Sequence, residues 1–293
     1  APDKKILVCY WGSWSVYRPG QCAFSVDQID PFLCTHIVYS FTKIQDNRIT
    51  LFDPWLELPD NGGRDMLRKL NDLRLVNPRL KTMIAIGGWN EGSTNYSMMA
   101  STAAGRQTFV NSVITFLNQH RFDGFDLDWE YPTERGGAPR DYVNYVLLLK
   151  ELRRAFGDRY LLSVAVTPNQ DVVDRAYNVP EMNKYVDIIN IMGYDFFGAW
   201  DNYTGHNAPL RARKGASEPE SRMNVVNAVN HWIARGADVS KMLLGVPLYG
   251  RTFLLEDSKY AGFMAPSVGP GPKGPCSGTD GSLGFNEVRE TSL

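Results

Sequence analysis

Seven short apolar segments, rich in β-branched residues, recur along the chain. They cover residues 6–8, 36–41, 82–87, 123–128, 161–166, 186–192 and 242–247. They are near-continuous hydrophobic runs rather than alternating ones, which is typical of parallel strands covered on both faces. Amphipathic helical patterns lie between them, the best at residues 64–75, 105–120, 139–156 and 220–235. This alternation predicts an α/β fold with a parallel sheet, either a doubly wound sheet or a (β/α)₈ barrel.

Polar and aromatic residues follow four of the predicted strands. The first strand is followed by Trp11-Gly12-Ser13-Trp14 and not by a Gly-rich phosphate-binding turn, which argues against a nucleotide-binding sheet. In a barrel, the carboxyl ends of all strands surround one mouth, where active sites of this architecture lie. The four clusters therefore favour a barrel with a site at its mouth; they are residues 87–90, 128–131, 192–195 and 249–251.

The fourth predicted strand carries an unusual series of acids, because residues 123–130 read Asp-Gly-Phe-Asp-Leu-Asp-Trp-Glu. Side chains alternate along a strand, so Asp126, Asp128 and Glu130 share one face and the apolar residues take the other. If that face points inward, the three groups cannot all stay ionised, and one holds the proton that a general acid needs. An acidic turn or a calcium loop is the alternative, and the interleaved apolar residues argue against it. Asp123 has the opposite parity, which predicts a structural role.

Composition narrows the class of protein. With 43% hydrophobic and 22% charged residues, the chain has the make-up of a soluble globular protein. A net charge of −1 without a Lys/Arg cluster gives no support for a nucleic-acid or anionic-membrane partner. The four cysteines form no metal-ligand pattern, so no metal site is predicted, while their even number permits disulfides. Glycosylation sequons at Asn95 and Asn202 favour secretion.

In its acid series and in the clusters that follow the predicted strands, the sequence resembles the family 18 glycoside hydrolases, in particular the animal secreted chitinases. The family signature Asp-x-x-Asp-x-Asp-x-Glu is matched by Asp123, Asp126, Asp128 and Glu130. Further matches cover nearly the whole chain, at residues 8–11, 33–36, 86–89, 192–195 and 245–251. The resemblance implies a (β/α)₈ TIM barrel over residues 1–251, with an α+β insertion after the seventh strand that begins at residues 252–293. It also implies that the chain ends before the eighth strand, which supplies a Trp beneath the reacting sugar, and that the native protein continues past Leu293.

The resemblance implies an endo-acting chitinase that needs no cofactor and retains anomeric configuration by substrate assistance. The 2-acetamido oxygen of the sugar would attack the anomeric carbon and give an oxazolinium intermediate. Glu130 would protonate the leaving oxygen and then deprotonate water, while Asp128 would bind the acetamido N–H and share a proton with Asp126. Tyr194 would orient the acetamido group, and Asp195 would contact the same sugar and tune Glu130.

The resemblance also implies the substrate-binding residues and one disulfide. The disulfide would join Cys9 to Cys34, whereas the pairing of Cys22 and Cys276 stays open, because Arg289 occupies the place of a family cysteine. The protein would be a secreted monomer acting on chitin or chito-oligosaccharides, with no nucleic-acid or membrane partner. The substrate-binding residues would be Tyr10, Trp14, Phe41, Trp89, Asn90, Tyr131, Met192, Tyr249 and Arg251.

Other functions are compatible with the same barrel. A non-catalytic chitin-binding lectin is the main alternative, although inactive relatives usually lose the Glu that Glu130 matches. An endo-N-acetylglucosaminidase acting on glycoprotein glycans shares the acid motif, and the chitinase-like flanking segments argue against it. A structural or storage protein would not explain acids gathered at one mouth. Residues 262–284, rich in Gly, Pro and Ser, are expected to form a loop.

Overall fold

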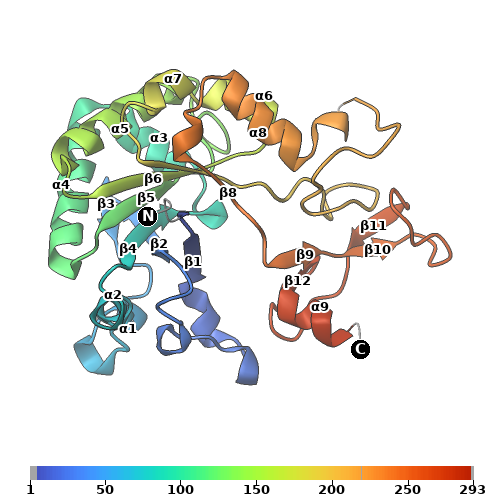
Figure 1. Cartoon of the computed structure of the whole chain (residues 1–293), viewed down its shortest axis with the longest axis horizontal. Helices are drawn as coiled ribbons and strands as arrows, with labels where there is room; N and C mark the ends of the chain where they lie inside the picture. The colour runs from blue at the N-terminus through green and yellow to red at the C-terminus, as the bar shows by residue number, and fades with distance from the viewer. Residues whose placement is uncertain (1–4, 219, 292–293) are drawn as a thin grey trace.

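A computed structural model describes residues 5–218 and 220–291 of the chain. Its main sheet curls into a half-barrel (Figure 1), and neighbouring strands of its main path are parallel. The predicted parallel α/β fold is confirmed. The strand order is β1 (Val8–Gly12), β2 (His36–Gln45), β4 (Lys81–Gly87), β5 (Gly124–Asp128), β6 (Leu161–Val166), β7 (Ile188–Ile191) and β8 (Met242–Leu244), with β3 (Arg48–Thr50) antiparallel to β2.

The central strands β4, β5, β6 and β7 are buried on both faces, which explains their near-continuous apolar sequences, whereas β1 and β8 at the two ends of the sheet are only partly buried. On β5 all five residues are buried, and Phe125 and Leu127 pack in the main hydrophobic core with the helices. The other face of the sheet carries a small apolar cluster of Val38, Met83 and Ala85. Asp126 and Asp128 alternate with Phe125 and Leu127, so they point toward this second, concave face.

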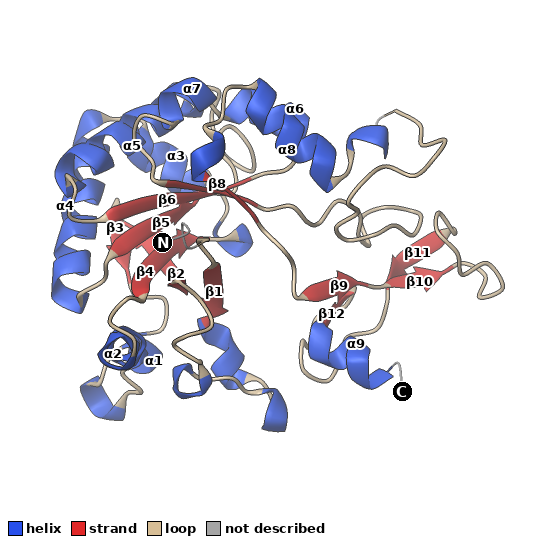
Figure 2. Ribbon diagram, in the orientation of Figure 1, coloured by secondary structure: helices blue, strands red, loops and turns tan. Residues whose placement is uncertain are grey.

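Helices cover the outer face of the sheet (Figure 2). In α4, Thr102 caps the first turn by accepting from Gly105 N at 3.0 Å, and the helix ends at Arg121 in a left-handed conformation. Among the described residues, no helix has the length and apolar content needed to cross a bilayer. The helices are α1 (Pro54–Glu57), α2 (Met66–Val76), α3 (Thr94–Ala100), α4 (Ala103–His120), α5 (Asp141–Phe156), α6 (Gln170–Ala176), α7 (Val179–Met182) and α8 (Val225–Ala234).

The segment after β8 lies beside the main sheet (Figure 1) and forms two small antiparallel pairs, β9 with β12 and β10 with β11. The expectation that residues 262–284 form a loop is wrong in part, because β11 and β12 lie within them. β11 pairs with β10 and β12 pairs with β9, and these partners satisfy the backbone hydrogen bonds of the two strands. The Gly- and Pro-rich composition of the segment did not indicate this pairing. The elements are β9 (Tyr249–Arg251), β10 (Phe253–Leu255), β11 (Ser267–Pro270), β12 (Ser282–Gly284) and α9 (Phe285–Thr291).

Short 3₁₀ turns complete the fold, and two of them follow strands of the main sheet directly. Because η1 follows β1 and η5 follows β4, both lie at the carboxyl edge of the sheet. The turns are η1 (Ser13–Tyr17), η2 (Gly20–Cys22), η3 (Val26–Gln28), η4 (Asp60–Gly62), η5 (Trp89–Glu91), η6 (Glu220–Arg222) and η7 (Val239–Lys241).

Candidate active site

Three buried carboxylates follow one another on β5 and just beyond its end. Asp126 and Asp128 belong to the strand, and Glu130 lies two residues past its last residue. Their exposed fractions are 0%, 4% and 8%. Loss of hydration disfavours a charged carboxylate, so burial raises the pKa of all three. The three acids cannot all be ionised at neutral pH.

Asp126 receives hydrogen bonds from the neighbouring strand β6 and, across the concave face, from β1. Ser163 Oγ on β6 donates to its Oδ1, and the Tyr10 hydroxyl on β1 donates to its Oδ2 at 3.0 Å. Asn190 on β7 donates to the Tyr10 oxygen at 3.0 Å, so these contacts reach across the concave face. Burial raises the pKa of Asp126 to about 6, and hydrogen bonds from Ser163, Tyr10 and Asn190 oppose the rise. Asp126 is therefore mainly ionised at pH 7.

Asp128 has a different environment, although it lies on the same strand. Its buried Oδ1 has no hydrogen-bond partner among the described residues. Burial raises the pKa of Asp128 well above its usual value, and the negative charges of Glu130 and Asp126 raise it further. The donors around Asp126 stabilise its charged form, whereas Asp128 has no such support on Oδ1. A proton shared within this pair therefore resides mainly on Asp128.

Glu130 is poised between its two protonation states near neutral pH. Burial raises its pKa to about 7, a hydrogen bond from Tyr131 and the charge of Arg135 oppose that rise, and the charge of Asp195 adds to it. A carboxyl group with a pKa close to the working pH can give up a proton and take one back. The position and pKa of Glu130 fit a general acid that later acts as a base.

Arg135 holds the end of β4 against the end of β5, a role that was not predicted from the sequence. Its Nη1 donates to Trp89 O at 2.6 Å and to Glu130 O at 3.2 Å. Its guanidinium also lies 3.6 Å from the centroid of the Trp89 ring, a cation–π arrangement. The surrounding loop carries no spacing or periodicity that could have distinguished Arg135 from a solvent-exposed arginine.

Gly87 and Gly88 allow this close approach of the two strand ends. Both have positive φ values, 114° and 85°. A Cβ at Gly87 would lie 2.0 Å from Asp128 O, and Gly88 N donates to that oxygen at 2.9 Å. A larger residue at Gly87 would therefore displace β5 and the acids on it. The Gly-Gly-Trp sequence is a geometric requirement of the site as well as a sequence match.

The loop after β7 brings Tyr194 and Asp195 to the same region. Asp195 has a left-handed backbone with φ of 58°, and its Oδ1 accepts from Arg251 Nε at 2.8 Å. Asn207 fixes this loop, because its Oδ1 accepts from Asp195 N at 3.0 Å and its Nδ2 donates to Tyr249 O at 3.0 Å. The rings of Tyr194 and Tyr249 meet edge to face at 6.0 Å. Asn207 was not predicted from the sequence.

The aromatic residues at the carboxyl ends of β1 and β4 divide into core and surface. Trp11 is only 5% exposed and packs edge to face on Tyr39. In contrast, Trp14 and Trp89 are 52% and 58% exposed. Trp14 stacks on Phe41 with ring centroids 6.1 Å apart. The other predicted substrate-binding residues border the same mouth: Asn90 is exposed beside Trp89, Tyr10 is partly exposed, and Tyr131, Met192, Tyr249 and Arg251 are half-buried.

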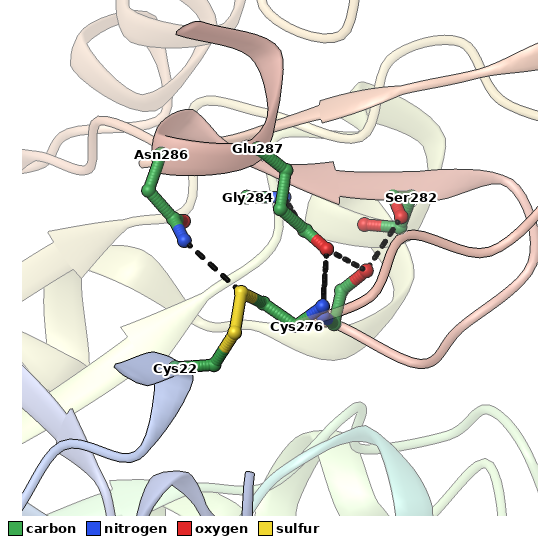
Figure 3. Close-up of a disulfide and its surroundings, with 7 residues drawn as sticks. Cys22, Cys276, Ser282, Gly284, Asn286 and Glu287 are labelled. Carbon is green, nitrogen blue, oxygen red and sulfur yellow. Dashed lines mark hydrogen bonds between the residues drawn. A yellow bond between two sulfur atoms is a disulfide. The ribbon is translucent and has the colours of Figure 1, made fainter. Parts of the chain in front are cut away.

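The cysteines form two disulfides. Cys9 is bonded to Cys34, with a Cα–Cα distance of 6.2 Å. Cys22 is bonded to Cys276 (Figure 3), a pairing that the sequence left open. Asn95 in α3 and Asn202 in the loop after β7 are both exposed. Within residues 5–218 and 220–291, no group of three or more His, Cys, Asp or Glu side chains is placed to hold a metal ion.

Asp123 takes no part in the acid cluster. Its Oδ2 accepts from Thr82 N at 2.9 Å and pairs with Arg74 Nη1 at 2.9 Å. These contacts anchor the start of β5 to β4 and α2, so the structural role predicted from its parity is confirmed.

Comparisons with known proteins agree with this geometry. The model of the glycosyl hydrolases family 18 matches residues 6–291. Probable chitinase 2 of Drosophila melanogaster is 43% identical over 290 residues, 98% of this chain and 58% of that protein, so the chain spans less than two thirds of this relative. A group IV chitinase of Ostrinia furnacalis in complex with allosamidin has a TM-score of 0.94 at 43% identity, covering 98% of this chain and 78% of that one. Human YKL-39, a pseudo-chitinase with retained chitooligosaccharide binding, has a TM-score of 0.89 at 33% identity, covering 98% of this chain and 78% of that one.

Proposed function

The chain belongs to family 18 of the glycosyl hydrolases, and from this membership we propose that it is a secreted, endo-acting chitinase. Its substrate is a polymer or oligomer of β-1,4-linked N-acetylglucosamine. The observation that carries the proposal is the series of buried acids on β5 and just beyond its end. Asp126 is stabilised as a carboxylate, Asp128 holds a proton, and burial raises the pKa of Glu130 to about 7. The relatives named as chitinases supply the substrate class.

In this proposal the three acids have separate roles. Glu130 protonates the leaving glycosidic oxygen and then accepts a proton from water. The 2-acetamido oxygen of the sugar attacks the anomeric carbon, so no second carboxylate is needed as the nucleophile. Asp128 binds the acetamido N–H and stabilises the positive oxazolinium as its own proton passes to Asp126. Tyr194 and Asp195 hold the same sugar, and the exposed aromatic residues stack on its neighbours.

Substrate assistance predicts the configuration of the first product. Two inversions at the anomeric carbon give net retention, so the new reducing end is expected to be the β-anomer. Proton NMR during the first minutes of chitohexaose hydrolysis measures this before mutarotation. Initial release of the α-anomer would exclude the proposed route and indicate direct attack by water.

Arg135 gives a second prediction, because its charge lowers the pKa of Glu130. In Arg135→Met, Glu130 stays protonated to higher pH, and the alkaline limb of the kcat/KM profile is expected to move upward. The matched control is Arg159→Met, which removes the same charge just before β6, at the opposite edge of the sheet. If the alkaline limb of Arg135→Met stays at the parent pH or moves to lower pH, the charge of Arg135 does not lower the pKa of Glu130 and the prediction is wrong.

A chito-oligosaccharide-binding lectin is the second candidate function. It is favoured by the similarity to human YKL-39, a pseudo-chitinase that retains binding. The presence of Glu130 with a pKa near 7 favours the enzyme. A fluorogenic chito-oligosaccharide assay together with calorimetric binding separates the two, since a lectin binds the oligosaccharide without releasing fluorophore.

Two further parts of the proposal concern organisation and location. We place the barrel domain at residues 1–251 and the start of the insertion domain at residues 252–293. Two disulfides fit an oxidising compartment, which supports secretion. Exposed sequons at Asn95 and Asn202 are available to N-glycosylation there.

A further inference from the structure

The Cys22–Cys276 disulfide joins two parts of the chain that are 254 residues apart. Cys22 ends η2 in the connection between β1 and β2, whereas Cys276 lies between β11 and β12. Figure 3 shows the bond crossing from the first of these segments to the second. The bond therefore ties a loop at the carboxyl edge of the half-barrel to the segment that follows β8.

The Cys276 end of this bond is held rigidly by Glu287 (Figure 3). Glu287 Oε1 accepts from Cys276 N at 2.7 Å and from Ser277 N at 2.9 Å, and Oε2 accepts from Gly284 N at 2.6 Å. Burial acts to raise the pKa of Glu287, but these backbone donors outweigh it, and the pKa is lowered. Glu287 is thus a carboxylate at neutral pH, and its three donors fix the loop before β12.

A cavity of about 350 Å³ lies between the two linked segments. We call it the distal cavity. Its volume falls at the lower end of the range of small-molecule sites, about 300–1,000 Å³. One wall belongs to η1 and the residues after it, and the other is the loop that Glu287 fixes. The lining residues are Trp14, Tyr17, Arg18, Pro19, Pro275, Cys276, Ser277 and Gly278.

A row of aromatic contacts connects the distal cavity to the candidate active site. Trp14, which lines the cavity, stacks on Phe41. Phe41 lies against Gly88, because a Cβ built there would be 2.8 Å from the Phe41 ring. Gly88 precedes Trp89, which contacts the Arg135 that also binds Glu130 O. The distal cavity therefore continues the mouth in the direction of η1.

The lining of the distal cavity has the chemistry of a saccharide site. Trp14 and Tyr17 are 52% and 55% exposed, so the part of the Trp14 ring that Phe41 does not cover and the ring of Tyr17 are open to stacking on sugar rings. Arg18 forms no ion pair with any residue that the structure describes, which leaves its guanidinium free to donate to hydroxyl or acetamido oxygens. Ser277 lies on the opposite wall, where its hydroxyl donates to Ser282 O at 3.1 Å and helps to hold that wall in place.

We propose that the Cys22–Cys276 disulfide is a covalent clamp that sets the spacing of these two walls, and that the clamped cavity binds a distal sugar of a long chito-oligosaccharide. This inference rests on the proposed function, since it takes the substrate class from it. A wall that is already in place does not have to be ordered when the sugar binds, so the clamp favours long substrates over short ones. Short substrates that occupy only the centre around Glu130 do not reach the distal cavity.

The test compares a long and a short substrate in a Cys22→Ser/Cys276→Ser double variant. We expect kcat/KM for chitohexaose to fall about tenfold, while the value for 4-methylumbelliferyl chitobioside changes less than about twofold. The ratio of the two values is the readout, because a loss of folded protein lowers both equally. The matched control is Cys9→Ser/Cys34→Ser, which removes the disulfide that does not line the cavity, and its ratio is expected to match that of the parent. Arg18→Met, which keeps the clamp, is expected to lower the same ratio.

A binding experiment separates failure of the clamp from failure of the proposed function. In a Glu130→Gln background, calorimetry gives the Kd values of chitohexaose and chitobiose with and without the clamp. Selective weakening of the hexamer supports the clamp even if the parent protein proves to be inactive. An unchanged ratio of Kd values, or equal weakening of both sugars, overturns it.

Discussion

Replacing Glu130 by Gln is expected to lower kcat for chito-oligosaccharide hydrolysis by about 10²–10⁴-fold, the usual worth of a general acid–base group. Gln has nearly the shape of Glu and keeps hydrogen-bonding capacity, but it has no proton to give at neutral pH. Because the exposed aromatic residues are untouched, the Kd for chitohexaose is expected to stay within a few-fold of the parent value. Initial rates with a fluorogenic substrate and calorimetric titration measure the two quantities.

Glu134→Gln is the matched control for this experiment. Glu134 lies four residues along the chain, is only partly buried, and its Oε1 is 2.8 Å from Arg175 Nη2. The same change of one carboxylate to an amide should leave kcat near the parent value there. Parent-like turnover in Glu130→Gln would remove the acid–base assignment, and equal losses in both variants would point to a general effect of charge.

Replacing Asp128 by Asn is expected to lower kcat by about 10²–10³-fold with a smaller change in KM. This is the typical cost of losing one preorganised electrostatic group that acts on developing charge. The amide keeps the shape of Asp128 but cannot become negative when the oxazolinium forms. The loss therefore falls on the transition state rather than on ground-state binding, and steady-state kinetics at several substrate concentrations separates the two.

Asp128→Asn is also expected to raise stability at alkaline pH. Burial raises the pKa of Asp128 in the folded state above its usual value of 3.8. Above pH 3.8 the unfolded state releases this proton while the folded state keeps it, so the free energy of unfolding falls as pH rises toward the raised pKa. An amide does not titrate, so the variant loses this part of the decline. Thermal unfolding at pH 5 and pH 8 measures the difference.

Asp123→Asn provides the internal control, since it is the same substitution three residues before the acid series. Asp123 pairs with Arg74 and accepts from Thr82 N, so its loss is expected to reduce stability and leave kcat close to the parent value. Asp128→Asn is therefore expected to lower kcat and raise stability at alkaline pH, whereas Asp123→Asn is expected to lower stability and leave kcat unchanged. If Asp128→Asn kept parent-like kcat, the assignment of Asp128 to stabilisation of the intermediate would be wrong.

The period-two alternation of residues 123–130 was enough to predict which acids share one face of the strand. Once the strand is recognised, strand geometry assigns each residue to one of its two faces. Asp123 is therefore assigned to a different face from Asp126 and Asp128 without any tertiary information. Similarly, the near-continuous apolar runs predicted parallel strands buried on both faces. These features are local, and the structure confirmed them.

The protonation pattern of the acids needed the tertiary structure. Asp126 and Asp128 look equivalent in the sequence, but donors from β1 and β6 reach one and not the buried Oδ1 of the other. Ser163 and Asn190 appear in the sequence as isolated polar residues in apolar strands. Pairing of β5 with β6 sets Ser163 beside Asp126, and the curvature of the sheet brings Tyr10, which Asn190 contacts, to the other oxygen of Asp126.

The sequence by itself determined that the sheet is parallel, that its strands alternate with helices, and which three acids share a strand face, because each depends on spacing within one segment. The tertiary structure decided the contacts between segments: Arg135 against Trp89, Asn207 between Asp195 and Tyr249, and Cys22 bonded to Cys276. Such contacts depend on where a loop crosses the edge of the sheet, and no periodicity records that position. The two pairs of cysteines show the difference, since the resemblance implied Cys9–Cys34 and only the folded chain brings Cys22 to Cys276 across 254 residues.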